Sequence, residues 1–113
     1  MLNECKAALR ITTTAYDGEL CSLMDAGAKD LKIAGVVLPG TVAFQTTNQG
    51  IVDSSTLTDA LCMRAIFTYV RMLFGSPDDY ERLLEAYQTQ KVQLMHASDY
   101  TDYDEEAEGD GES

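Results

Sequence analysis

Residues 60–95 read ALCMRAIFTYVRMLFGSPDDYERLLEAYQTQKVQLM, and this stretch decides the fold. Before Gly75, apolar residues recur with helical spacing on nearly every side, and after Pro77 they keep to one face. Between these two helical patterns lie Gly75, which can end a helix, Ser76 as an N-cap, Pro77 at a first helical position and two acids suited to the helix dipole. We therefore predict one helix from Thr56 to Phe74 and another from Pro77 to about His96.

The residues that precede this stretch predict two further helices. Apolar side chains fall on one side of residues 2–10, and Thr12-Thr13-Thr14 then interrupts the helical pattern. From about Ala15 apolar residues recur at steps of three and four, with acids early and lysines late, as the helix dipole favours. This second helix should end at Gly35.

The helical period disappears between residues 36 and 55. Pro39-Gly40 and Asn48-Gln49-Gly50 indicate turns, and Val36–Leu38 could pair with Thr41–Phe44 as a short hairpin. A loop of roughly twenty residues is uncommon in a small helical domain and usually binds a partner or is partly mobile. The expected fold class is all-α: a small four-helix bundle with a long, hairpin-containing loop between its second and third helices.

Charge divides the chain into a body and a tail. The net charge is −11, but residues 98–113 contain eight acids and no base, which leaves 11 acidic and 8 basic residues, a net charge of −3, in residues 1–97. The last segment also lacks apolar periodicity. We expect one helical domain over 1–97 and a disordered acidic tail over 98–113.

The sequence offers little catalytic equipment. Three cysteines, Cys5, Cys21 and Cys62, lie on apolar helical stripes and suit buried, reduced packing positions, and the single histidine, His96, falls at the end of the last helix. There is no glycine-rich nucleotide loop, and the acids between Asp102 and Glu112 lack the spacing of a calcium loop. We expect no enzyme activity, no cofactor and no metal, and the catalytic alternative is a thiol enzyme that uses Cys21 or Cys62.

The sequence also bears on membranes and DNA. It contains no apolar run of transmembrane length and no secretion signal, so we expect a cytosolic chain at synthesis and no membrane partner. Its basic residues are few and mixed with acids, which argues against sequence-specific DNA binding. A neutral to acidic surface would suit a passage through which DNA slides without adhering.

Four segments in order resemble a known family: LRI at 9–11, YDGELCSLMDA at 16–26, AIFTYVRMLFG at 65–75 and YERLLEAY at 80–87. The chain resembles the head-tail connector, or head completion adaptor, family of tailed bacteriophages over roughly residues 1–96, apart from the loop and the tail. The resemblance implies a four-helix subunit in a homo-oligomeric ring of about a dozen copies. It also implies a portal protein above the ring, a tail-side completion or tail protein that binds later, and genomic DNA that passes through. The expected location is the head-tail junction of the virion, after assembly in the host cytoplasm, and the family has no catalytic residues to transfer.

The residues themselves suggest where copies would meet. The helix at 56–74 is apolar on almost every side, so either a neighbouring subunit or the other three helices must cover it. Arg64 and Arg71 lie on one face and could pair with acids of a neighbour, within the chain, or with solvent. With Val37, Val42 and Phe44 they form our candidate subunit or partner interface. The alternative function is a small acidic regulator whose tail mimics nucleic acid and occupies a basic partner.

Overall fold

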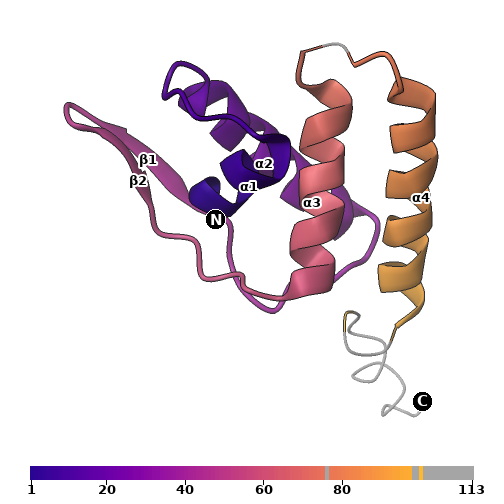
Figure 1. Cartoon of the computed structure of the whole chain (residues 1–113). Helices are drawn as coiled ribbons and strands as arrows, with labels where there is room; N and C mark the ends of the chain where they lie inside the picture. Colours follow the sequence, from indigo (N-terminus) through magenta and orange to yellow (C-terminus); the bar gives the residue numbers. More distant parts are fainter. Residues whose placement is uncertain (76, 98–99, 101–113) are drawn as a thin grey trace.

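The computed structural model describes residues 1–75, 77–97 and 100. Four helices account for most of this part: α1 (Leu2–Leu9), α2 (Asp17–Ile33), α3 (Ala60–Leu73) and α4 (Tyr80–His96). A two-stranded sheet, β1 (Phe44–Thr47) and β2 (Gly50–Asp53), follows α2 and precedes α3 in the chain and projects to one side of the helices (Figure 1). The chain is therefore mainly helical, but it is not the pure four-helix bundle that we expected. The predicted disorder of the tail concerns 98–113, of which only Tyr100 lies within the described residues.

The helices α3 and α4 lie side by side and are joined by a short connection (Figure 1). Asp59 caps α3, because its Oδ1 accepts hydrogen bonds from the backbone N–H groups of Leu61 and Cys62, both at 3.0 Å. The helix thus begins at Ala60, and the predicted start at Thr56 was wrong. Thr56 is instead hydrogen-bonded to the backbone N–H of Thr41 at 2.8 Å, which fixes it in extended chain.

The start predicted for α4 was also wrong. A turn at residues 78–79 follows Pro77, so the helix begins at Tyr80 and its N-cap is Asp79 rather than Ser76. The carboxylate of Asp79 makes no capping hydrogen bond and pairs instead with Arg82 one turn into the helix. The predicted end at His96 is confirmed.

The two N-terminal helices end in left-handed backbone. Arg10 has a φ of 60°, and the backbone N–H of Ile11 reaches back to the carbonyl of Lys6 at 2.9 Å, which closes α1. Gly35 follows α2 with a φ of 100°, as its sequence position predicted. Helix α2 begins at Asp17, two residues later than expected.

One hydrophobic core lies where α3 meets α2 and α4. Helix α3 buries Cys62, Ala65, Ile66, Val70 and Met72. Facing them are buried residues of α2 and α4: Leu20, Met24, Ala28, Leu31, Leu83, Tyr87 and Leu94. The other helices therefore cover much of α3 within one chain, and a neighbour is not needed for that. Two of its apolar side chains, Leu61 and Leu73, remain 49% and 41% exposed.

The hairpin lies later in the chain than we expected. Phe44 pairs with Asp53 and Thr47 with Gly50, around a two-residue turn at Asn48-Gln49. Residues 36–38 form no strand, because the chain after Gly40 runs beside residues 56–57 instead. A Cβ on Gly40 would lie 2.6 Å from the Cα of Leu57, so glycine permits this close approach.

Hydrogen bonds extend the hairpin beyond its strands. The backbone N–H groups of Thr56 and Leu57 donate to the carbonyl of Thr41 at 2.9 and 3.1 Å, and that of Ser54 donates to Ala43 at 2.9 Å. We refer to residues 41–56 as the hairpin arm. The segment predicted as a long loop is thus largely a structured arm.

Candidate interaction surfaces

A groove lined by arginines lies along α3, against α4 and against the end of α1. It consists of three adjoining hollows of about 570, 490 and 50 Å³. Ala8 and Arg71, which are hydrogen-bonded to each other, line both the first and the second hollow, and Arg64 and Gln90 line both the first and the third, so each hollow adjoins the next. We refer to them together as the arginine groove. Its floor in the largest hollow is apolar, with Met63, Phe67 and Leu83.

All four arginines of the chain line this groove, and none of the described residues that line its three hollows is acidic. Arg71 donates from Nη2 to the carbonyl of Ala8 at 2.5 Å, and Arg82 pairs with Asp79. Arg64 and Arg10 are exposed and make no ion pair with any residue in the described part of the chain. Since guanidinium groups present several donors in a planar fork, this surface suits carboxylates or phosphates.

The lysines are used differently. The lysine Nζ atoms form ion pairs with carboxylate oxygens: Lys6 with Oδ1 of Asp17 at 2.9 Å, Lys29 with Oδ2 of Asp25 at 3.1 Å, and Lys91 with Oδ2 of Asp30 at 3.2 Å. Three of the four lysines are therefore paired within the chain, away from the arginine groove. Uncompensated positive charge is concentrated in the groove, although the described body has a small net charge.

The structure brings only part of our candidate interface together. Arg64 and Arg71 share the arginine groove, as their spacing predicted. Val37 is 47% exposed and its backbone N–H donates to the carbonyl of Tyr100, which itself lines the third hollow. Val42 and Phe44 belong to the arm and are half-buried against the core. The five residues therefore do not form one continuous patch.

Sequence reasoning missed Arg10 and Arg82 as members of the same groove. They come from the end of α1 and the start of α4, so no helical spacing connects them with the arginines of α3. The available signal was that the chain has four arginines and that few acids flank Arg10, Arg64 and Arg71, whereas Arg82 is flanked by Asp78, Asp79, Glu81 and Glu85. That signal alone does not indicate proximity.

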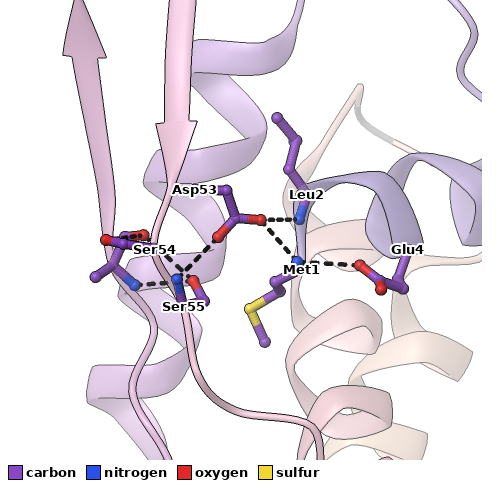
Figure 2. Close-up of polar contacts among 7 residues, drawn as sticks. Met1, Leu2, Glu4, Asp53, Ser54 and Ser55 are labelled. Atoms are coloured by element: carbon purple, nitrogen blue, oxygen red, sulfur yellow. Dashed lines mark hydrogen bonds and ion pairs between the residues drawn. The ribbon is translucent and has the colours of Figure 1, made fainter.

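A second feature is the junction between the hairpin arm and α1. Oδ2 of Asp53 accepts hydrogen bonds from the Met1 amino group at 2.6 Å and from the backbone N–H of Leu2 at 2.8 Å (Figure 2). Its Oδ1 accepts the backbone N–H of Ser55 at 3.1 Å. Partial burial opposes ionisation of Asp53, but these hydrogen bonds outweigh it and lower its pKa from 3.8 to about 2. The carboxylate therefore attaches the arm to the helical body.

A third polar cluster joins α2 to α4. The buried Tyr87 donates its hydroxyl proton to Oδ2 of Asp30 at 2.5 Å, and Lys91 donates to the same oxygen at 3.2 Å. Partial burial raises the pKa of Asp30, but the two hydrogen bonds lower it more, so the net shift is downward. The ring of Tyr69 meets that of Tyr87 edge-to-face at 5.3 Å between centroids. Tyr87 is buried, whereas the side chains of Asp30 and Lys91 are 37% and 25% exposed, so the cluster links α2 to α4 at the edge of the core.

The cysteines and the histidine form no catalytic arrangement among the described residues. Cys5, Cys21 and Cys62 are free and buried. Burial is the largest cause that raises their thiol pKa values, to about 11, 11 and 12, so the thiols stay protonated at neutral pH. His96 is exposed at the end of α4. The described residues also contain no group of three metal-binding side chains, and the carboxylates after residue 101 lie outside them.

None of the helices in residues 1–75 and 77–97 is both long and apolar enough to cross a bilayer.

Comparison with known protein families identifies the chain. A family model described as "Phage connector protein" matches residues 1–101. The chain belongs to this phage connector family. The match includes all four helices and the hairpin arm, and so extends further than the segments that carried the resemblance. No curated protein and no solved structure matches the chain significantly.

Membership gives the chain a coarse role. It is a structural connector component of a bacteriophage, and the resemblance seen in the sequence is confirmed. The match ends at residue 101, so most of the acidic segment lies outside it. The arginine groove and the hairpin arm lie within the matched part of this connector.

Proposed function

We propose that this connector chain assembles with copies of itself into a ring between the portal and the tail. DNA passes through this ring, and the tail attaches to it. The family match over residues 1–101 carries the proposal, because it spans the whole described body rather than one motif. The partners would be the portal protein on one side and a tail-side completion or tail protein on the other. The chain would act in the virion, after assembly in the host cytoplasm.

The hairpin arm is the element best suited to reach a neighbouring subunit. It projects from the helices (Figure 1), and its two strands pair only with each other among the described residues. Each strand therefore has an outer edge with backbone groups that can pair with another chain. Val52 adds an apolar side chain that is 46% exposed. The Asp53 junction holds the base of the arm, which reduces the entropy lost when a partner binds.

The same structure supports a role without catalysis. Thiols with raised pKa values are poor nucleophiles, and each is buried. We expect alkylation of folded protein to be slow and to accelerate in denaturant. Rapid labelling of Cys21 or Cys62 in the folded chain would favour the thiol-enzyme alternative instead.

Reconstitution tests the proposal directly. Purified full-length chain should form rings by itself or on isolated portal rings, as measured by native mass spectrometry and electron microscopy. A chain that stays monomeric and does not bind portal rings would overturn the proposal. Electron microscopy of whole particles should place the chain at the head-tail junction.

Truncation separates this role from that of an acidic regulator. The truncation should begin after Thr101, because Tyr100 contacts the body through Val37 and through Asp59, whose Oδ2 accepts the Tyr100 hydroxyl at 2.8 Å. Ring assembly or portal binding that survives loss of residues 102–113 supports the connector. Loss of all partner binding would favour nucleic-acid mimicry by the tail.

A further inference from the structure

The arginine groove is a basic surface in a chain whose net charge is −11, with Arg10 and Arg64 unpaired among the described residues. We propose that the acidic C-terminal segment of the same chain, residues 102–113, binds in this groove as an extended strand. The proposal does not depend on ring assembly or on the portal. It rests on where the body ends, how far the segment reaches and how its charges are spaced.

The described chain ends beside the groove. Tyr100 lines the third hollow together with Arg64 and Gln90. Its carbonyl and hydroxyl are hydrogen-bonded to Val37 and Asp59, so this point of departure is fixed on the body. The first acid of the segment, Asp102, follows two residues later.

The segment is long enough to follow the groove. Extended chain spans about 3.3 Å per residue, so residues 102–113 reach about 40 Å. Arg64 and Arg71 are separated by seven residues of α3, or about 10 Å along the helix. The reach therefore exceeds what the arginines of α3 require.

The acids have the spacing of one side of a strand. Every even-numbered residue from 102 to 112 is acidic: Asp102, Asp104, Glu106, Glu108, Asp110 and Glu112. In extended chain alternate side chains point to the same side, about 6.7 Å apart. The segment can thus turn a continuous row of carboxylates toward the arginines, with Glu105 as the one acid on its other side. A helix would scatter these acids around its axis.

The groove also offers a partner for the backbone of the segment. Oε1 of Gln90 is buried and has no hydrogen-bond partner among the described residues. Gln90 lies where the first and third hollows meet, on the path from Tyr100 toward Arg71. Once the Gln90 side chain turns toward the hollow, a backbone N–H of the extended segment can satisfy this oxygen.

Covalent attachment favours this occupant over other anions. A segment tethered at Tyr100 has an effective concentration in the millimolar range at the groove. A free acidic peptide or a DNA phosphate must compete with that concentration. Docking would therefore also shield the basic groove from the phosphates of DNA.

Paramagnetic relaxation measured by NMR can test the docking in the full-length chain. A nitroxide at Ala107→Cys leaves every acid in place, and the native cysteines are buried. At low salt we expect loss of amide intensity at Thr68, Arg71 and Ala86, but not at Asn48 and Gln49 in the turn of the arm. No loss at the groove would overturn the proposal.

Matched variants test which charges matter. The double variant Arg64→Gln/Arg71→Gln should abolish the loss, whereas Lys29→Gln/Lys32→Gln, which removes the same charge from α2, should preserve it. If the arginine and lysine double variants have equal effects, docking depends on net charge alone, and a site specific to the groove is overturned. Likewise Glu106→Gln should weaken the effect more than Glu105→Gln, and equal weakening would overturn the one-sided extended arrangement.

Mixing separates binding within one chain from binding between chains. Labelled chain without ¹⁵N is added to ¹⁵N chain without a label, and we expect no intensity loss. Loss in this mixture as strong as in the chain that carries both labels, after allowance for dilution, would overturn docking within the chain and assign the groove to the acidic segment of a second copy.

Discussion

The α2–α4 junction and the arginine groove both place basic side chains on α4, but they use them in opposite ways. At the junction Lys91 and Tyr87 converge on Asp30, and the groups satisfy one another. In the groove the arginines face hollows that no acid lines in the part of the chain that the structure describes. The junction is complete within one chain, whereas the groove is left with charge for a ligand. Mutations should therefore affect stability in the first region and binding in the second.

The largest effect is expected at the junction. Tyr87→Ala should lower the free energy of unfolding by about 3–5 kcal/mol, because it empties a buried aromatic position and removes the hydrogen bond to Asp30. Urea denaturation measures this value. Tyr80→Ala, on the same helix but 41% exposed, is the control and should cost about 1 kcal/mol or less. Similar losses for the two variants would contradict a structural junction.

The carboxylate of the junction should contribute less than the tyrosine. Asp30→Asn keeps the shape but removes the charge that Lys91 and Tyr87 address, and we expect a loss of about 1–2 kcal/mol at pH 7. The control is Asp25→Asn, whose partner Lys29 is 69% exposed, and it should change stability by about 0.5 kcal/mol or less. Thermal unfolding of both variants against the parent chain tests this ranking.

The arm junction predicts a dependence on acid. The pKa of Asp53 falls from 3.8 in unfolded chain to about 2 in the fold, so its stabilisation is present above about pH 4 and is lost as the pH falls toward 2. Asp53→Asn should therefore be less stable than the parent at pH 6, with a smaller difference at pH 3. Urea denaturation at both values measures this. A difference that does not change with pH would contradict the ionic role of Asp53.

The smallest effect on stability is expected in the groove. Arg64→Gln should change the free energy of unfolding by about 0.5 kcal/mol or less, because its side chain is exposed and unpaired among the described residues. Denaturation and tail docking can be measured on the same sample. A large destabilisation would show that Arg64 supports the fold and would remove the contrast between the two regions.

The sequence predicted the helices well, but it predicted their starts and the position of the hairpin less well. The four helices and their apolar faces were predictable, because periodic burial is a local property that sequence records. The starts of the helices were less predictable. Thr56 and Asp59 are both of residue types that favour the N-cap, and only the hydrogen bonds between Thr56 and Thr41 show that Asp59 is the cap. The hairpin was placed too early, because nothing local reveals that Gly40 packs against Leu57.

For the candidate surfaces the sequence identified part of the groove. Arg64 and Arg71 were grouped correctly, since seven residues along a helix bring two side chains to one face. Arg10, Arg82 and the buried amide of Gln90 join them only through the packing of three helices. Val42 and Phe44 were grouped with the arginines although they belong to the arm.

By itself the sequence determined which segments are helical, which residues are apolar enough to be buried and where negative charge accumulates. These follow from local spacing and composition, which need no knowledge of distant contacts. The tertiary structure decided which charges are neutralised and which stay available, because pairing depends on residues that are far apart in sequence and adjacent in space. Lys91 of α4 pairs with Asp30 of α2, while the arginines converge on a groove whose described lining contains no acid.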